Sequence, residues 1–103
     1  MKQGDIRWYK FGSPDKKRPV LILTRNSVLD YLGEVTIAPI TSTIRGIPSE
    51  VFLSESDGMP RDSAINFDHI QTVSKSKVGS LITTTSPQKM KQVREAIIFA
   101  LNL

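Results

Sequence analysis

Two residues beside strand-like segments carry side chains suited to phosphate chemistry. Arg18 directly precedes Pro19 and an apolar run, and the proline biases Arg18 toward an extended backbone. A planar guanidinium that stays charged in proteins binds a phosphate through two parallel hydrogen bonds. Thr41 follows Pro39-Ile40, and its hydroxyl can donate to a phosphate oxygen or accept from a substrate hydroxyl. On the residues alone, a solvated arginine and a threonine bonded to its own loop stay open as alternatives.

The composition gives no support to metal or thiol chemistry. The chain has one histidine and no cysteine, and its carboxylates show no spacing typical of metal ligands. Thiolate nucleophiles, disulfides and cysteine metal sites are therefore excluded. A phosphodiester can still be cleaved without a metal ion when a neighbouring hydroxyl attacks its phosphorus. That reaction needs in-line geometry, stabilisation of charge on the phosphate oxygens and the transfer of two protons.

Length and charge narrow the class of protein. With 103 residues, of which 39% are hydrophobic and 23% charged, we expect one globular domain spanning 1–103. So small a core leaves little stability margin, which formation of a dimer would increase. The formal net charge of +4 favours a polyanionic partner such as nucleic acid. We see no signal-peptide-like run and no membrane-spanning run, so we expect a cytoplasmic protein with no membrane partner.

Short strands must position Arg18 and Thr41. The β-branched and apolar segments predict strands over 5–11, 19–24, 34–40 and 49–53. Segments rich in glycine, proline and hydroxyl residues predict turns or loops at 12–17, 25–33 and 41–48, with one helical turn inside the second. In the first strand, Ile6, Trp8 and Phe11 are expected to point inward.

The second half of the chain predicts one long strand and a helix. Residues 63–73 are strand-like throughout, with a bulge or bend near Asp68-His69, where the apolar alternation changes phase. Ser86 can cap a final helix that has Pro87 at its first position. The apolar face of that helix is expected to hold Met90, Val93, Ile97 and Leu101. Many short strands followed by one amphipathic helix predict a small barrel with a helix packed against it.

Four segments together resemble the MazF/PemK family of toxin ribonucleases. They are Gly-Asp-Ile-Arg-Trp at 4–8, Arg-Pro-Val-Leu-Ile-Leu at 18–23, Ala-Pro-Ile-Thr-Ser at 38–42 with Gly-Ile-Pro-Ser-Glu-Val at 46–51, and Asp-Ser-Ala-Ile-Asn-Phe-Asp-His-Ile-Gln-Thr-Val at 62–73. Each fragment alone is common in proteins. All four follow the order and spacing of the family, over nearly the whole chain.

The resemblance implies a mainly β fold with a C-terminal helix, a small SH3-like barrel of the MazF/PemK/CcdB type. It also implies the toxin of a type II toxin–antitoxin system, a homodimer that cuts single-stranded RNA at short sequence motifs without a metal or other cofactor. The family's catalytic pair falls on Arg18 and Thr41. A cognate antitoxin is expected to lay a disordered, acidic tail along the RNA groove of the dimer.

Further side chains are candidates for RNA contacts. Residues 11–17 are expected to form a mobile flap, and phosphate contacts are expected from Lys16, Lys17 and Arg45, with ordinary surface charge as the alternative. Ser42 and Thr43 are weaker candidates for backbone contacts. The resemblance places three polar residues in or near the RNA and antitoxin surface: Asn66, Asp68 and Gln71. Asn and Gln side chains can read base edges, whereas a hydrogen-bonded bulge is the alternative.

The histidine and the aromatic residues have open roles. His69 stands where many relatives carry glutamine, and it could stack on a base, titrate near neutral pH or be structural. Aromatic side chains can also stack on bases, but core packing is the favoured interpretation for most of them, which are Trp8, Phe11, Phe52 and Phe67.

Two other functions compete with RNA cleavage. A CcdB-type toxin shares the barrel and the dimer but inhibits gyrase, and that activity depends on a terminal tryptophan. This chain ends in Leu101-Asn102-Leu103, which disfavours a gyrase inhibitor. A catalytically silent nucleic-acid-binding barrel is the second alternative, because catalysis needs a finer geometry than a motif specifies.

Overall fold

The computed structural model describes residues 1–12 and 16–103, so the centre of the expected flap, residues 13–15, lies outside the described residues. Within them, one sheet holds seven strands: β1 (Asp5–Phe11), β2 (Lys16–Ile22), β3 (Glu34–Thr41), β4 (Glu50–Leu53), β5 (Ser63–Asn66), β6 (Gln71–Ser74) and β7 (Val78–Thr84). The helices are α1 (Asn26–Leu29) and α2 (Pro87–Leu101), with short 3₁₀ turns η1 (Glu55–Asp57), η2 (Phe67–His69) and η3 (Lys75–Lys77).

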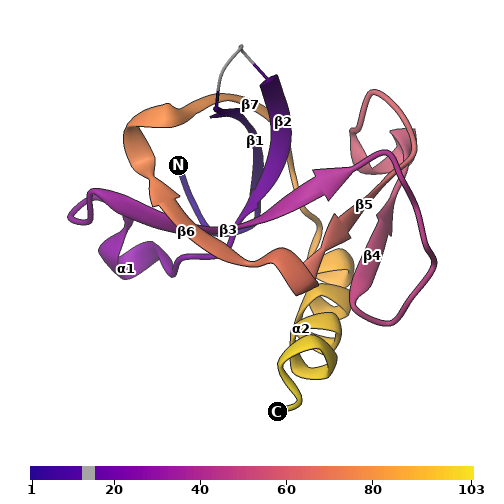
Figure 1. The fold of residues 1–103 in the computed structure, drawn as a ribbon. Coiled ribbons are helices and arrows are strands. Elements are labelled where there is room, and N and C mark those ends of the chain that lie inside the picture. Colours follow the sequence, from indigo (N-terminus) through magenta and orange to yellow (C-terminus); the bar gives the residue numbers. More distant parts are fainter. Residues whose placement is uncertain (13–15) are drawn as a thin grey trace.

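The antiparallel sheet curls into a partly closed barrel. The strand order is β4-β5-β3-β2-β1-β7, and β6 pairs with the first half of β3, where Val35 lies opposite Val73. The turn η3 joins β6 directly to β7, which pairs with β1, so the chain curves back around the same small ring (Figure 1). The predicted mainly β barrel with a C-terminal helix is therefore confirmed.

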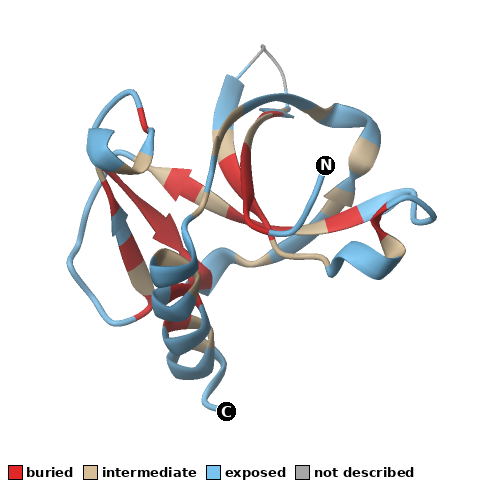
Figure 2. Ribbon diagram, turned by 180° about the vertical axis from the view of Figure 1, so that it is seen from behind, coloured by how far each residue is buried: buried red, intermediate tan, exposed pale blue. Residues whose placement is uncertain are grey.

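Strands β2 and β3, in the middle of the sheet, are buried on both faces. Val20 and Ile22 of β2 point into the barrel, whereas Leu21 between them joins a second core under α2. In β3 the same alternation sends Ile37 into the barrel and Ala38 toward the helix. Figure 2 shows the buried residues gathered on these strands. Burial on both faces explains why the sequence of β2 is a continuous apolar run rather than an alternating one.

The C-terminal helix begins where the sequence predicts. The Ser86 hydroxyl accepts a hydrogen bond from the Lys89 amide at 3.1 Å, and Pro87 occupies the first turn. Val93 and Ala96 are the buried residues of its inner face. The expectation for Leu101 is wrong, because this side chain is 55% exposed at the end of the helix, beyond the sheet that the helix covers. None of the helices in residues 1–12 and 16–103 combines the length and the apolar character needed to cross a membrane.

Other strand boundaries differ from the predicted ones, where the residues are buried on one face only or are exposed. The second strand begins at Lys16, because its polar start pairs with β1, and it ends at Ile22 rather than Thr24. In β1 it is Tyr9 that is buried with Ile6, while Trp8 and Phe11 are only partly buried. The expected single strand over 63–73 is wrong, since the turn η2 divides it at the predicted position of the bend. Strand β7 was not predicted because it has no buried residue and so carries no clear apolar alternation.

Candidate functional site

The site lies where β2 and β3 separate. The two strands pair over Ile22–Val20 and Ile37–Pro39, and the pairing stops there, although both strands continue. Had it continued for two more positions, Arg18 would lie opposite Thr41. Instead β3 turns to pair with β5, and β2 stays with β1, as Figure 1 shows. Pro19 lacks an amide hydrogen, which removes one ladder bond at this fork.

The fork opens a cleft with a volume of about 150 Å³. At ~30 Å³ per water molecule, this volume corresponds to roughly five waters, enough for a phosphodiester group and part of its ribose. The wall from β2 carries Lys17 and Arg18, and the wall from β3 carries Thr41 followed by Ser42. Four residues predicted from the sequence to contact RNA or catalyse its cleavage therefore line one cleft, although they form two pairs from separate strands.

The loop after β3 orients the Thr41 hydroxyl. The Thr43 amide donates to Thr41 Oγ1 at 3.0 Å, so this oxygen already accepts one bond and its own hydrogen is available for donation. The loop is tied down by Glu50, whose Oε1 accepts from the amides of Arg45 and Gly46 at 3.0 and 3.1 Å. The backbone around Thr41 is thus held before any ligand binds.

A third wall comes from Met59 to Ser63, where no site residue was predicted. Pro60, Arg61 and Ser63 line the cleft together with the buried Met59. The preceding turn places them: the Ser54 amide donates to Asp57 Oδ2 at 2.9 Å, and Gly58 adopts a φ of +93°. A side chain at Gly58 would also collide with Thr83, so only glycine fits here. Trp8, for which the sequence favours core packing, lines the cleft as well and is partly buried.

The cleft is positively charged. Among the described residues its lining includes the cations of Lys17, Arg18 and Arg61 and no carboxylate. Arg18 is exposed, and no hydrogen bond or ion pair joins its side chain to another described residue. A guanidinium that is not neutralised by the protein is available to an anion, and three converging cations favour a phosphate over a neutral ligand.

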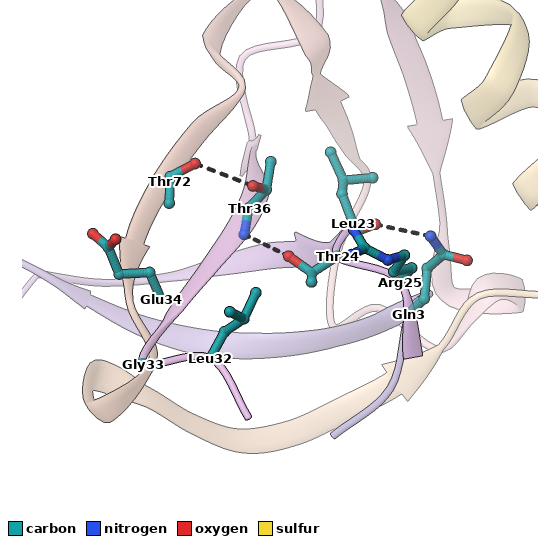
Figure 3. A pocket seen from close by; sticks show the side chains of 9 residues that line it. All are labelled: Gln3, Leu23, Thr24, Arg25, Leu32, Gly33, Glu34, Thr36 and Thr72. Carbon is teal, nitrogen blue, oxygen red and sulfur yellow. Dashed lines mark hydrogen bonds between the residues drawn. The ribbon is translucent and has the colours of Figure 1, made fainter. Parts of the chain in front are cut away.

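Three other hollows of the described residues carry a balanced or acidic lining. One of them is wider, at about 680 Å³, contains one arginine and one glutamate, and opens beside α1. Figure 3 shows that its polar groups bond to one another: the Thr36 amide donates to Thr24 Oγ1 at 2.8 Å, and the Gln3 side chain donates to the Leu23 carbonyl at 2.8 Å. Size alone therefore does not identify the site, and the charge of the lining does.

The remaining predicted residues lie outside the cleft lining. Three of them are exposed at the surface: Lys16, His69 and Gln71. Arg45 lies near Glu50, with Nη1 3.9 Å from Oε2, and Thr43 contributes its amide to the Thr41 loop. Asn66 is 7% exposed and bonds within the turn η2, where its Oδ1 accepts from the Asp68 amide at 2.9 Å. The Asp68 carboxylate accepts from the Ser49 hydroxyl at 2.7 Å.

No group of three or more His, Cys, Asp or Glu side chains suited to a metal ion occurs among residues 1–12 and 16–103. The cleft itself offers amines, guanidiniums and hydroxyls, which are poor ligands for a hard divalent cation. The chemistry that this lining supports is anion binding and hydrogen-bond donation.

Known proteins resemble this chain over most of its length. Over 89 residues, covering 86% of each chain, the sequence is 39% identical to the endoribonuclease MazF3 of Mycobacterium tuberculosis. The solved structure of the M. tuberculosis toxin MazF-mt6 superposes with a TM-score of 0.88 at 36% identity, over 96% of this chain and 97% of that one. A mycobacterial endoribonuclease solved in complex with its cognate antitoxin gives a TM-score of 0.88 at 26% identity, over 100% and 96% of the two chains.

The match to the family extends over almost every residue. Residues 2–101 fit the family described as PemK-like, MazF-like toxins of type II toxin–antitoxin systems. This range includes the fork between β2 and β3 and all three walls of the cleft. The chain therefore belongs to the PemK-like, MazF-like toxin family of type II toxin–antitoxin systems.

Proposed function

We propose that this MazF-type endoribonuclease cuts single-stranded RNA at short sequence motifs and without a metal ion, using one domain that spans 1–103. The ribose 2′-oxygen attacks the adjacent phosphorus, a 2′-oxygen–phosphorus bond forms, and the bond from phosphorus to the 5′-oxygen breaks. The products are a 2′,3′-cyclic phosphate and a 5′-hydroxyl. The observation that carries this proposal is the convergence of Arg18, Thr41 and two further cations on one small cleft, to which residues 1–12 and 16–103 contribute no carboxylate.

Arg18 and Thr41 are the proposed catalytic pair. The Arg18 guanidinium binds the scissile phosphate and stabilises the negative charge that grows on its oxygens in the transition state. Thr41 Oγ1, held by the Thr43 amide, donates its hydrogen to the same phosphate. An arginine gives up a proton reluctantly, so charge stabilisation is the role that its chemistry favours.

The other predicted contacts divide by position. Lys17 and Ser42, on the cleft, are proposed to bind the phosphate backbone beside the scissile bond. Lys16, Thr43 and Arg45 are proposed to bind the RNA strand further along the protein surface. Contacts from η2 and β6 (Asn66, Asp68, His69 and Gln71) are proposed to be made by RNA or antitoxin beyond the cleft, with Asn66 and Asp68 serving mainly to hold the turn.

RNA cleavage in the presence of EDTA tests the proposal. Sequencing of RNA ends after incubation with the purified protein identifies the cleaved motif, and an oligonucleotide of that sequence serves as substrate. We expect full cleavage in EDTA and a 5′-hydroxyl product. Replacing the 2′-hydroxyl of the scissile nucleotide with hydrogen should block the reaction, with the same replacement one nucleotide away as the control. An absolute need for magnesium, or cleavage of the deoxy-substituted bond, contradicts the mechanism.

We also propose a cytoplasmic homodimer that is silenced by an antitoxin. The mycobacterial relative solved with its cognate antitoxin supports the second point. Large apolar side chains at the end of α2, Phe99 at 59% and Leu101 at 55% exposure, support association with another protein surface. Light scattering gives the mass of the purified toxin. Co-purification with the product of a neighbouring gene, followed by the RNA assay, tests silencing, and cutting by the saturated complex contradicts it.

A further inference from the structure

One buried hydroxyl in the cleft has no partner. Ser63, the first residue of β5, is 4% exposed, and its Oγ makes no hydrogen bond to any described residue. Buried hydroxyls in folded proteins are nearly always paired, so an unpaired one at a cleft surface calls for a ligand. The other buried serine, Ser49, follows the general rule and donates to Asp68 at 2.7 Å.

The sheet sets Ser63 beside the proposed catalytic pair. The residue after it, Ala64, lies opposite Thr41 in the β3–β5 ladder, and on its other side Ser63 pairs with Leu53 of β4. Ser63 is therefore held between two strands next to the end of β3, and it lines the same cleft as Arg18. Because its backbone belongs to a ladder, the Cα and Cβ atoms of Ser63 are fixed before any ligand arrives, and its hydroxyl hydrogen can rotate toward an acceptor.

The surroundings indicate the chemistry of the missing partner. In the part of the chain that the structure describes, the cleft lining contains no carboxylate that could accept from Ser63, and its cations of Lys17, Arg18 and Arg61 cannot accept at all. An anionic oxygen held by these cations would accept the Ser63 hydrogen in a short, charge-assisted bond. This acceptor would enter with the substrate.

We propose that Ser63 donates a hydrogen bond to a non-bridging oxygen of the phosphate that Arg18 binds. This inference rests on the proposed function, and it adds a substrate-contacting residue from β5 to the pair from β2 and β3. The phosphate is thus held from three sides, by a guanidinium and by two hydroxyls on separate strands. A water molecule that merely fills the cleft is the competing occupant.

The first test compares two variants, each of which removes a different unpaired hydroxyl. Ser63→Ala should lower kcat/KM for RNA cleavage by roughly 10- to 100-fold, the usual effect of losing a hydrogen bond to a charged group. The midpoint of urea unfolding should stay the same or rise, because the lost hydroxyl has no partner within the protein. Thr85→Val is the matched control, since Thr85 Oγ1 is also buried and unpaired but Thr85 lines a different hollow. It should leave cleavage unchanged.

Sulfur substitution identifies the contacted atom. Oligonucleotides with one non-bridging oxygen of the scissile phosphate replaced by sulfur exist as two diastereomers, and sulfur accepts hydrogen bonds weakly. If Ser63 contacts one of these oxygens, one diastereomer should be cut more slowly by the wild-type protein, and Ser63→Ala should reduce that difference. Unchanged sulfur effects in Ser63→Ala overturn the contact, as does cleavage within twofold of wild type.

Binding separates this inference from the cleavage mechanism. Fluorescence anisotropy with an oligonucleotide that lacks the scissile 2′-hydroxyl measures affinity without cutting. Weaker binding by Ser63→Ala supports the contact even if the wild-type protein proves unable to cut RNA. If the wild-type protein cuts RNA and Ser63→Ala binds and cuts it equally well, the contact is overturned and the proposed function stands.

Discussion

The cleft between β2 and β3 and the turn η2 are both rich in polar side chains, but they use them differently. In the turn, Asn66 and Asp68 accept hydrogen bonds from an amide and from the buried Ser49 hydroxyl. In the cleft, the Arg18 guanidinium and the Ser63 hydroxyl bond to no other described residue. Polar groups that the fold itself satisfies stabilise the fold, and groups left without a partner are available to a ligand.

The cleft and the turn η2 also differ in charge. The cleft gathers three cations, whereas η2 carries an acidic residue at its start and is held by neutral partners. An RNA phosphate is attracted to the three cations of the cleft, and the Asp68 carboxylate offers it no such attraction. We therefore expect substitutions of the cleft cations to change activity at constant stability, and substitutions of Asn66 and Asp68 to change stability at constant activity.

The largest effect is expected for Arg18→Ala. Loss of the guanidinium should lower the rate of RNA cleavage at least 100-fold, because transition-state charge is then left unstabilised, by analogy with the loss of one oxyanion donor. The free energy of unfolding should change by less than about 0.5 kcal/mol, since the side chain is exposed and unpaired in the fold. A fluorogenic oligonucleotide and urea titration measure the two quantities. Arg94→Ala, on the exposed face of α2, is the matched control. An Arg18→Ala protein that cuts RNA normally would remove Arg18 from the site.

A smaller effect, on stability rather than on activity, is expected for Asp68→Ala. The change leaves the Ser49 hydroxyl buried without an acceptor, which should lower the free energy of unfolding by about 1–3 kcal/mol. Cleavage by the folded fraction should stay within a few-fold of wild type. Asp68→Asn, which keeps an acceptor oxygen, should recover most of the stability. Normal stability combined with a large loss of cleavage would instead assign Asp68 to the RNA surface.

The smallest effect is expected for Lys17→Ala. One phosphate contact fewer should lower the slope of log affinity against log salt concentration by about 0.7, the usual value per contact for a single strand. Anisotropy at several salt concentrations, with the uncleavable oligonucleotide, gives this slope. Lys91→Ala on α2 should leave it unaltered. Equal slopes for the wild type and Lys17→Ala would place Lys17 among ordinary surface charges.

The pattern of apolar residues was sufficient for much of the fold. The run Val20-Leu21-Ile22 predicted a buried strand, and Ser86-Pro87 predicted the start of α2, because burial and capping leave local traces in a sequence. Strand β7 left no such trace, since its residues are exposed or partly buried and it is held by pairing with β1. Tyr9 rather than Trp8 is buried with Ile6, because β1 meets a core on each face: Ile6 belongs to the core under α2, and Tyr9 belongs to the barrel core.

By itself the sequence determined the strand-rich fold with its final helix, and it singled out Arg18 and Thr41 through the motifs around them. Only the tertiary structure decided which polar residues share a cleft and which complete a turn. Arg61 and Ser63 join Arg18 through the ladders between β3, β5 and β4, more than forty positions along the chain. Whether a hydroxyl or a guanidinium has a partner depends on such long-range pairing, which no local pattern of residue types records.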